Sequence, residues 1–136
     1  MRSRFTSAVV ILLLVSGCAR TATAPPPGPQ QPAPVVDIGV AEAKRMIDTD
    51  PDVIILDVRT REEYDSGHID RAVLIPVSEL ERRTGELDRN KRILVYCRSG
   101  SRSRTASEIL IRQGFLRDNM LGGINAWVEA KYPVVT

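Results

Sequence analysis

Short apolar runs alternate with helical patterns between residues 35 and 136, and this alternation is the feature that most constrains the fold. Three of the runs are continuous and rich in Val, Ile and Leu: Val53–Leu56, Ala72–Ile75 and Ile93–Tyr96. Apolar runs of this length are typical of strands that are covered on both faces of a sheet. Weaker strand patterns lie at residues 35–37 and 119–121.

Helical patterns separate the apolar runs. They cover residues 40–49, 61–66, 77–84, 101–113 and 124–131. Strands that alternate with helices build parallel sheets with helices packed against them. We therefore predict an α/β domain over residues 35–136, with a mainly parallel sheet of four to five strands and helices on both faces. Binding sites of such sheets lie beyond the carboxyl ends of the strands.

The first 34 residues differ from the rest. Arg2 and Arg4 precede the apolar run Ala8–Val15, which is too short to span a bilayer and is typical of a signal peptide. The string Val15-Ser16-Gly17-Cys18 resembles the lipobox of bacterial lipoproteins, in which the cysteine is lipidated and becomes the first residue of the mature chain. We expect a signal peptide at 1–17, a lipidated Cys18, and a proline-rich linker over 18–34. An ordinary secretory signal with an incidental cysteine is the alternative.

This N-terminal pattern predicts where the protein acts. A lipid on Cys18 would anchor the exported chain to a membrane on the periplasmic side. Ala19 follows the cysteine in place of Asp, which favours the outer membrane over the inner membrane if the source is Gram-negative. Cys97 would then be the only free thiol of the mature chain.

Charge and composition argue against two classes of partner. The chain has 19 basic and 17 acidic residues and few aromatic residues, and it lacks a basic face with interleaved aromatic side chains. We therefore expect no nucleic-acid partner. No group of His, Cys and carboxylate residues has the spacing of metal ligands, so we expect neither a metal nor another cofactor.

The most reactive segment begins at Cys97, which directly follows the apolar run Ile93–Tyr96. It reads Cys-Arg-Ser-Gly-Ser-Arg-Ser and leads into a helical pattern. Backbone N–H groups of such a loop, together with the start of a helix, favour a thiolate over a thiol. We predict that Cys97 is a catalytic nucleophile. The alternative is a buried cysteine with a structural role only. The predicted anion cradle around its sulfur consists of Arg98, Ser99, Gly100, Ser101, Arg102 and Ser103.

Five blocks of the sequence resemble the rhodanese domain in its single-domain form. They occur in the order typical of that family and span Val35 to Val135. The blocks are Ile55–Arg59 with Glu62–Tyr64, Gly67–Ile69 with Ala72, Ile75–Pro76, Val95–Ser103, and Gly122–Trp127 with Pro133–Val134. The resemblance implies the three-layer rhodanese-like fold.

The resemblance also implies a function. A rhodanese-type sulfurtransferase moves a sulfane sulfur from a donor such as thiosulfate, through a persulfide that would form on Cys97, to cyanide or a thiol. The expected partners are a small anionic sulfur donor and a thiol acceptor, either a small molecule or a protein. One alternative is a non-catalytic module that binds sulfur or a partner. Another is a phosphatase or arsenate reductase, but phosphatases of this fold would have Arg at position 103, where this chain has Ser103 and places Arg102 one residue earlier.

Further residues carry roles that the resemblance implies. Asp57 and Arg59 are candidate supporting residues, with a mainly structural part in the family. His68, the only histidine, is expected to be structural. Arg71 and Lys131 stand where the family usually has Gly, and at Lys131 we expect the strain of a left-handed conformation.

Overall fold

Five parallel strands form one sheet in the computed structural model, which describes residues 34–136. Across the sheet the strands follow the order β1, β5, β4, β2, β3, and every neighbouring pair is parallel. The strands are β1 Val36–Ile38, β2 Ile54–Asp57, β3 Val73–Leu74, β4 Ile93–Tyr96 and β5 Arg117–Met120. This sheet confirms the predicted α/β fold.

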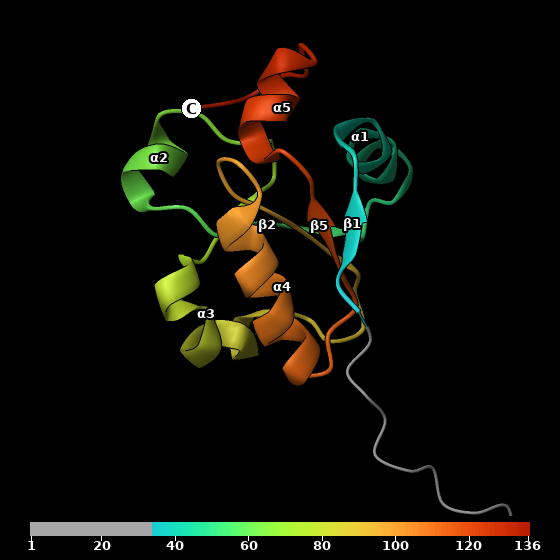
Figure 1. Ribbon diagram of the computed structural model, residues 1–136, viewed down its shortest axis with the longest axis vertical. Coiled ribbons are helices and arrows are strands. Elements are labelled where there is room, and N and C mark those ends of the chain that lie inside the picture. Colours follow the sequence, from blue (N-terminus) through green and yellow to red (C-terminus); the bar gives the residue numbers. More distant parts are fainter. Residues whose placement is uncertain (1–33) are drawn as a thin grey trace, which may run out of the picture. The chain divides into compact units, whose positions relative to one another are not determined.

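Helices cover both faces of this sheet, as predicted (Figure 1). They are α1 Val40–Thr49, α2 Arg61–Asp65, α3 Val77–Arg83, α4 Ser101–Arg112 and α5 Gly123–Glu129, with a short 3-10 turn at Thr84–Glu86. One apolar cluster joins the sheet to α3 and α4 through Leu80 and Leu110. The other joins it to α1 and α5 through Ala43 and Trp127.

The alternation of side chains along β4 decides toward which face of the sheet the Cys97 side chain points. Ile93 and Val95 belong to the cluster on the α3 and α4 face, whereas Leu94 and Tyr96 belong to the opposite cluster. Because side chains alternate along a strand, Cys97 returns to the α3 and α4 face, and it is part of that cluster.

The strand order creates a crevice between β2 and β4, which are neighbours at the centre of the sheet. From β2 the chain continues outward to β3, and from β4 it continues in the other direction to β5. At such a reversal the connections leave to opposite sides, which opens a crevice at the carboxyl ends of the two strands. Asp57 ends β2, and Cys97 follows directly on β4, so both lie at the carboxyl ends of these two strands.

Strand β5 begins earlier than its apolar pattern predicts. The expected strand covered residues 119–121, whereas the observed one starts at Arg117. Arg117 and Asp118 are nevertheless buried, since Arg117 donates to the carbonyl of Pro34 and Asp118 is ion-paired with Arg92. These polar partners offset the cost of burying the charges of Arg117 and Asp118 inside the sheet.

Among residues 34–136, two residues other than glycine have a left-handed backbone, with φ of 64° at Arg71 and 63° at Lys131. The strain expected at Lys131 is confirmed, because the penalty of this conformation falls on residues with a Cβ atom.

The predicted signal peptide, Cys18 and the linker up to residue 33 lie outside the described residues. Within residues 34–136, none of the helices is long and apolar enough to cross a membrane.

Candidate active site

The loop between β4 and α4 wraps around the sulfur of Cys97. The cysteine is completely buried, and the backbone N–H of Gly100 donates to its Sγ at 3.1 Å. Gly100 has a φ of 108°, which bends the chain back over the sulfur immediately before α4 begins. The loop therefore presents its own amide hydrogens to the atom that would carry negative charge.

The surroundings of Cys97 stabilise its thiolate. Burial raises the pKa of the thiol, but the Ser103 hydroxyl and the backbone N–H groups of Ser103, Gly100 and Ser99 lower it. The lowering contributions exceed the effect of burial, so the pKa of Cys97 lies below its usual value. A larger fraction of the sulfur is then the nucleophilic thiolate at neutral pH.

The N-terminus of α5 holds the loop through backbone hydrogen bonds. The backbone N–H of Ile124 donates to the carbonyl of Cys97 at 2.9 Å, and that of Asn125 donates to the carbonyl of Arg98 at 3.1 Å. A Cβ atom on Gly123 would come within 2.4 Å of the Cys97 carbonyl oxygen and 2.6 Å of the Arg98 carbonyl group. Only glycine allows this close approach, so Gly123 helps to fix the backbone of the nucleophile.

A chain of hydrogen bonds connects the loop to the sheet edge. The Ser103 hydroxyl donates to Oδ1 of Asn119 at 2.6 Å, and Nδ2 of Asn119 donates to Oδ1 of Asp37 at 2.7 Å. Arg104 donates to the other carboxylate oxygen of Asp37 at 2.8 Å. Ser103 and Asn119 are buried, so these bonds hold the Ser103 hydroxyl in a defined place beside the sulfur.

The two arginines of the predicted cradle differ in their contacts. Arg102 makes a two-pronged ion pair with Glu63 of α2, with both N–O distances at 2.7 Å. Hydrogen bonds from Arg102 are the largest influence on Glu63 and lower its pKa to about 2, so Glu63 is ionised at neutral pH. Arg98 is exposed and forms no ion pair with any residue of the described range.

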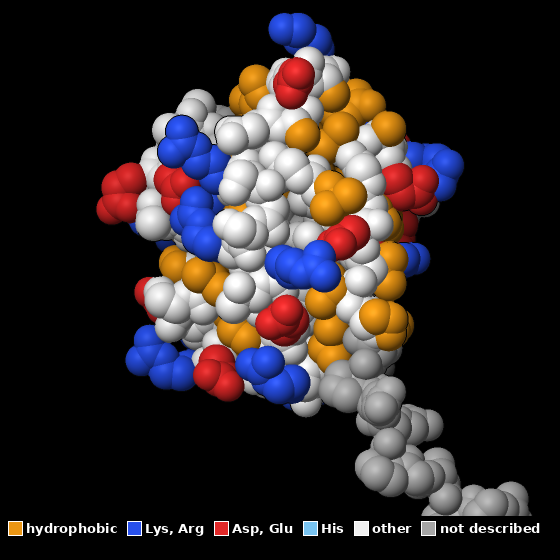
Figure 2. Space-filling model, in the orientation of Figure 1, with side chains coloured by type: hydrophobic (Ala, Val, Ile, Leu, Met, Phe, Trp, Pro, Cys, Tyr) orange, Lys and Arg blue, Asp and Glu red, His pale blue; other side chains and the backbone are white. Residues whose placement is uncertain are grey.

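Ionic partners are common on this side of the molecule. In Figure 2, basic and acidic side chains are interspersed on the face over α2, α3 and α4. Arg98 is one of several surface cations without an ion pair in the described range, and it differs from the others in lining the pocket next to the reactive loop.

Asp57 and Arg59 form a buried ion pair at the crevice. The Nη2 of Arg59 lies 2.6 Å from Oδ2 of Asp57 and donates to the carbonyl of Gly67 at 2.7 Å. The Arg59 guanidinium also lies over the ring of Tyr96 at 5.6 Å. These contacts tie β2 to the turn after α2 and agree with the mainly structural part that the resemblance implies.

His68 and Trp127 also have structural contacts. The backbone of His68 pairs with Val135 in both directions at 2.9 Å, and its ring stacks on Tyr64. Trp127 is buried in the core and donates from Nε1 to the carbonyl of Pro133.

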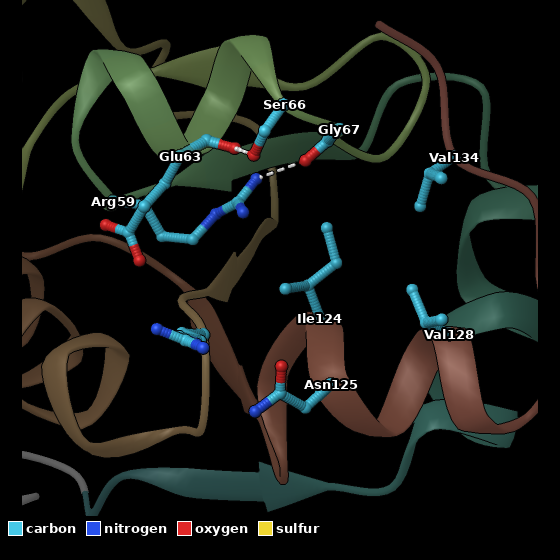
Figure 3. A pocket seen from close by; sticks show the side chains of 9 residues that line it. Arg59, Glu63, Ser66, Gly67, Ile124, Asn125, Val128 and Val134 are labelled. Carbon is cyan, nitrogen blue, oxygen red and sulfur yellow. Dashed lines mark hydrogen bonds between the residues drawn. The ribbon is translucent and has the colours of Figure 1, made fainter.

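A pocket of about 480 Å³ adjoins the reactive loop (Figure 3). In this view Ile124 and Val128 rise from α5 and Val134 points down toward them, while Arg59 and Glu63 lie across the pocket beside α2. Its lining consists of Arg59, Glu63, Ser66, Gly67, Arg98, Ile124, Asn125, Val128 and Val134. A volume of this size accommodates a small organic molecule.

The structure places all seven predicted loop residues at one end of β4, and their catalytic roles stay a prediction. Ser99 and Ser101 expose their side chains to solvent, whereas Ser103 is buried beside the sulfur. No sequence pattern assigned Glu63, Gly123, Asn119 or Asp37 to the site. A signal existed for Glu63, because Thr60 and Glu63 have the spacing of a capping box, which the structure contains, but that motif predicts a helix start and not a partner for Arg102.

Comparisons with known proteins agree with this geometry. The family model described as a rhodanese-like domain matches residues 39–130. A protein of Allochromatium vinosum named sulfurtransferase is 37% identical over 94 residues, which cover 68% of this chain and 87% of that protein. A Bacillus subtilis protein, provisionally named sulfur carrier protein YrkF, is 38% identical over 94 residues, which are 68% of this chain but only 51% of that longer relative. Among solved structures, a rhodanese-related protein of Thermoplasma volcanium has a TM-score of 0.69 at 36% identity, with 74% of this chain and 97% of that one covered.

Proposed function

The chain belongs to the rhodanese-like domain family, and we propose that it is a sulfurtransferase that carries sulfane sulfur as a persulfide on Cys97. The observation that carries the proposal is the set of hydrogen bonds around the Cys97 sulfur. The Gly100 N–H contact at 3.1 Å and the lowered pKa are the properties that a thiolate nucleophile needs.

The proposed first step uses a donor such as thiosulfate. The Cys97 thiolate attacks the outer sulfur, a new S–S bond forms to Cys97, and the S–S bond of thiosulfate breaks. Sulfite leaves with the electron pair of that bond. Backbone N–H groups of the loop stabilise the resulting persulfide anion, as they stabilise the thiolate before it.

The second step returns the enzyme to its starting state. A thiolate or cyanide attacks the outer sulfur of the persulfide, and the bond inside the persulfide breaks. Its electron pair returns to Cys97 as a thiolate, and the acceptor leaves with the sulfur. The two half-reactions balance without an added oxidant or reductant, and they predict ping-pong kinetics.

The surroundings of Arg102 favour sulfur transfer over phosphate hydrolysis. A phosphatase loop needs a guanidinium that is free to bind the oxygens of a phosphoryl group. Arg102 instead donates hydrogen bonds from both of its terminal nitrogens to the carboxylate of Glu63. The burial of Cys97 also favours a substrate whose reacting sulfur atom is terminal.

We also propose that the chain is exported and held at a membrane by a lipid on Cys18. The support is the sequence alone, namely the short apolar run followed by Val15-Ser16-Gly17-Cys18. Metabolic labelling with a fatty acid is expected to mark the wild-type protein and not the Cys18→Ser variant.

Turnover tests the enzymatic proposal. Purified protein with thiosulfate and cyanide is expected to form thiocyanate, and Cys97→Ser is expected to form none above background. A wild-type protein that accepts sulfur but never passes it to cyanide or any thiol would be a sulfur-binding module and would contradict the proposed enzyme.

A further inference from the structure

The charges around the pocket of Figure 3 leave one cation without a partner. Arg59 is neutralised by Asp57 and Arg102 by Glu63, each through close hydrogen-bonded contacts. Arg98 lines the same pocket and has no ion pair within residues 34–136. The pocket therefore offers a bound molecule one uncompensated positive charge, which suits a single anionic group.

The opposite wall of the pocket is apolar. Ile124, Val128 and Val134 line it, and 50% of Val128 and 42% of Val134 are accessible to solvent. Both valines converge on one space in Figure 3, although they come from α5 and from the C-terminal segment. Exposed apolar side chains that face one cavity favour a ligand with an aliphatic part.

The position of the pocket connects it to the reactive atom. Arg98 is the residue after Cys97, and the backbones of Ile124 and Asn125 are hydrogen-bonded to the carbonyls of Cys97 and Arg98. Glu63 lines the pocket and also holds Arg102 of the same loop. A ligand in the pocket thus lies against the loop that carries the sulfur, and a small inorganic ion would leave most of the roughly 480 Å³ unfilled.

We propose that this pocket is the acceptor subsite, and that it takes a low-molecular-weight aliphatic thiol with one carboxylate. The carboxylate binds Arg98, the aliphatic chain packs on Ile124, Val128 and Val134, and the thiol reaches the Cys97 persulfide. This inference rests on the proposed sulfur transfer. The acceptor thiolate attacks the outer persulfide sulfur, the bond to Cys97 breaks, the electron pair returns to Cys97, and the acceptor leaves as its own persulfide.

The first test measures binding without chemistry. Hexanoate has the carboxylate and the aliphatic chain but no thiol, and hexylammonium has the same chain with the opposite charge. Titration of the full chain, followed by methyl NMR, is expected to shift the signals of Ile124, Val128 and Val134 with hexanoate and not with hexylammonium. The methyl signals of Leu116, which is exposed but lies outside the pocket, are expected to stay in place.

Three variants assign the binding to this pocket. Arg98→Gln is expected to weaken hexanoate binding about tenfold, the usual size of a hydrogen bond to a charged group. Val128→Ser is expected to weaken it about threefold, as for the loss of one or two buried methyl groups. Leu116→Ser, a matched loss of exposed apolar surface outside the pocket, is expected to leave binding unchanged.

The second test follows transfer from protein loaded with thiosulfate and freed of excess donor. Mercaptohexanoate is expected to remove the sulfur about tenfold faster than aminohexanethiol of equal chain length, and Arg98→Gln is expected to abolish that preference. Equal binding of hexanoate and hexylammonium, absent methyl shifts, or equal weakening by Leu116→Ser would overturn the assignment of this subsite. Failure of the protein to load with sulfur would overturn the proposed function instead, and the hexanoate titration would still report on the pocket.

Discussion

The Ser103 hydroxyl donates to Oδ1 of Asn119 at 2.6 Å and so joins the loop of the nucleophile to the neighbouring strand β5. The same hydroxyl is among the groups that lower the pKa of Cys97, which it does when its single hydrogen turns from Asn119 to the sulfur. Ser103 therefore couples the position of the loop to the reactivity of the sulfur. Its partner Asn119, and Asp37 behind Asn119, belong to strands of the sheet and are distant from Ser103 in the sequence.

Ser103→Ala is expected to raise the pKa of Cys97, because it removes the hydroxyl that favours the thiolate over the thiol. The rate of alkylation by iodoacetamide follows the thiolate, so its rise with pH should shift to higher pH in the variant. Ser78→Ala removes an exposed hydroxyl on α3 and serves as the control. An alkylation profile that Ser103→Ala leaves in place would contradict this role.

Glu63→Gln is expected to speed persulfide formation with thiosulfate about threefold at low salt. The substitution removes a negative charge beside the loop and leaves Arg102 uncompensated, which favours a dianionic donor. The measurement is the second-order loading rate at several salt concentrations, and the gain should fade as salt screens the charges. Glu81→Gln, an exposed carboxylate on α3, provides the comparison, and a slower Glu63→Gln would show that the ion pair itself is needed.

Gly123→Ala is expected to cost about 2–4 kcal/mol in the free energy of unfolding, since the new methyl group would overlap the Cys97 and Arg98 carbonyls. Chemical denaturation measures this loss. At Gly85 a Cβ atom would meet nothing within 4 Å, so Gly85→Ala should be neutral or stabilising by about 0.5 kcal/mol. Equal stability of the two variants would mean that α5 can move away from the loop freely.

Lys131→Gly is expected to stabilise the fold by about 1 kcal/mol, because glycine adopts the left-handed conformation without the penalty of a Cβ atom. The neighbouring Ala130 has a φ of −71°, so Ala130→Gly should instead destabilise by about 0.5–1 kcal/mol. Thermal or chemical unfolding of both variants checks the sign. A loss of stability in Lys131→Gly would show that the lysine side chain makes contacts that outweigh the backbone strain.

Much of the fold was predictable because apolar periodicity decides where elements form. The helix over 40–49 was predicted with its observed bounds, and the strand at 93–96 likewise. The start of β5 was missed because Arg117 and Asp118 do not look like buried strand residues. Their burial depends on Arg92 and Pro34, partners that no local pattern reveals.

The site was predictable to the extent that it is local. The loop from Cys97 to Ser103 is one continuous segment, so its composition and its position after a strand were sufficient. The engagement of Arg102 by Glu63 joins residues that are 39 positions apart, and the chain from Ser103 to Asp37 joins α4 to the edge strand. Such contacts arise from strand order and helix packing, which no single segment encodes.

Intact mass spectrometry of the protein after incubation with thiosulfate tests the central claim most directly. The wild-type chain is expected to gain the mass of one sulfur atom, to release sulfite in equal amount, and to lose the added mass when cyanide is supplied. Cys18→Ser should gain the same mass, and Cys97→Ser should gain none. An unchanged wild-type mass, or a gain that persists in Cys97→Ser, would contradict a persulfide on Cys97.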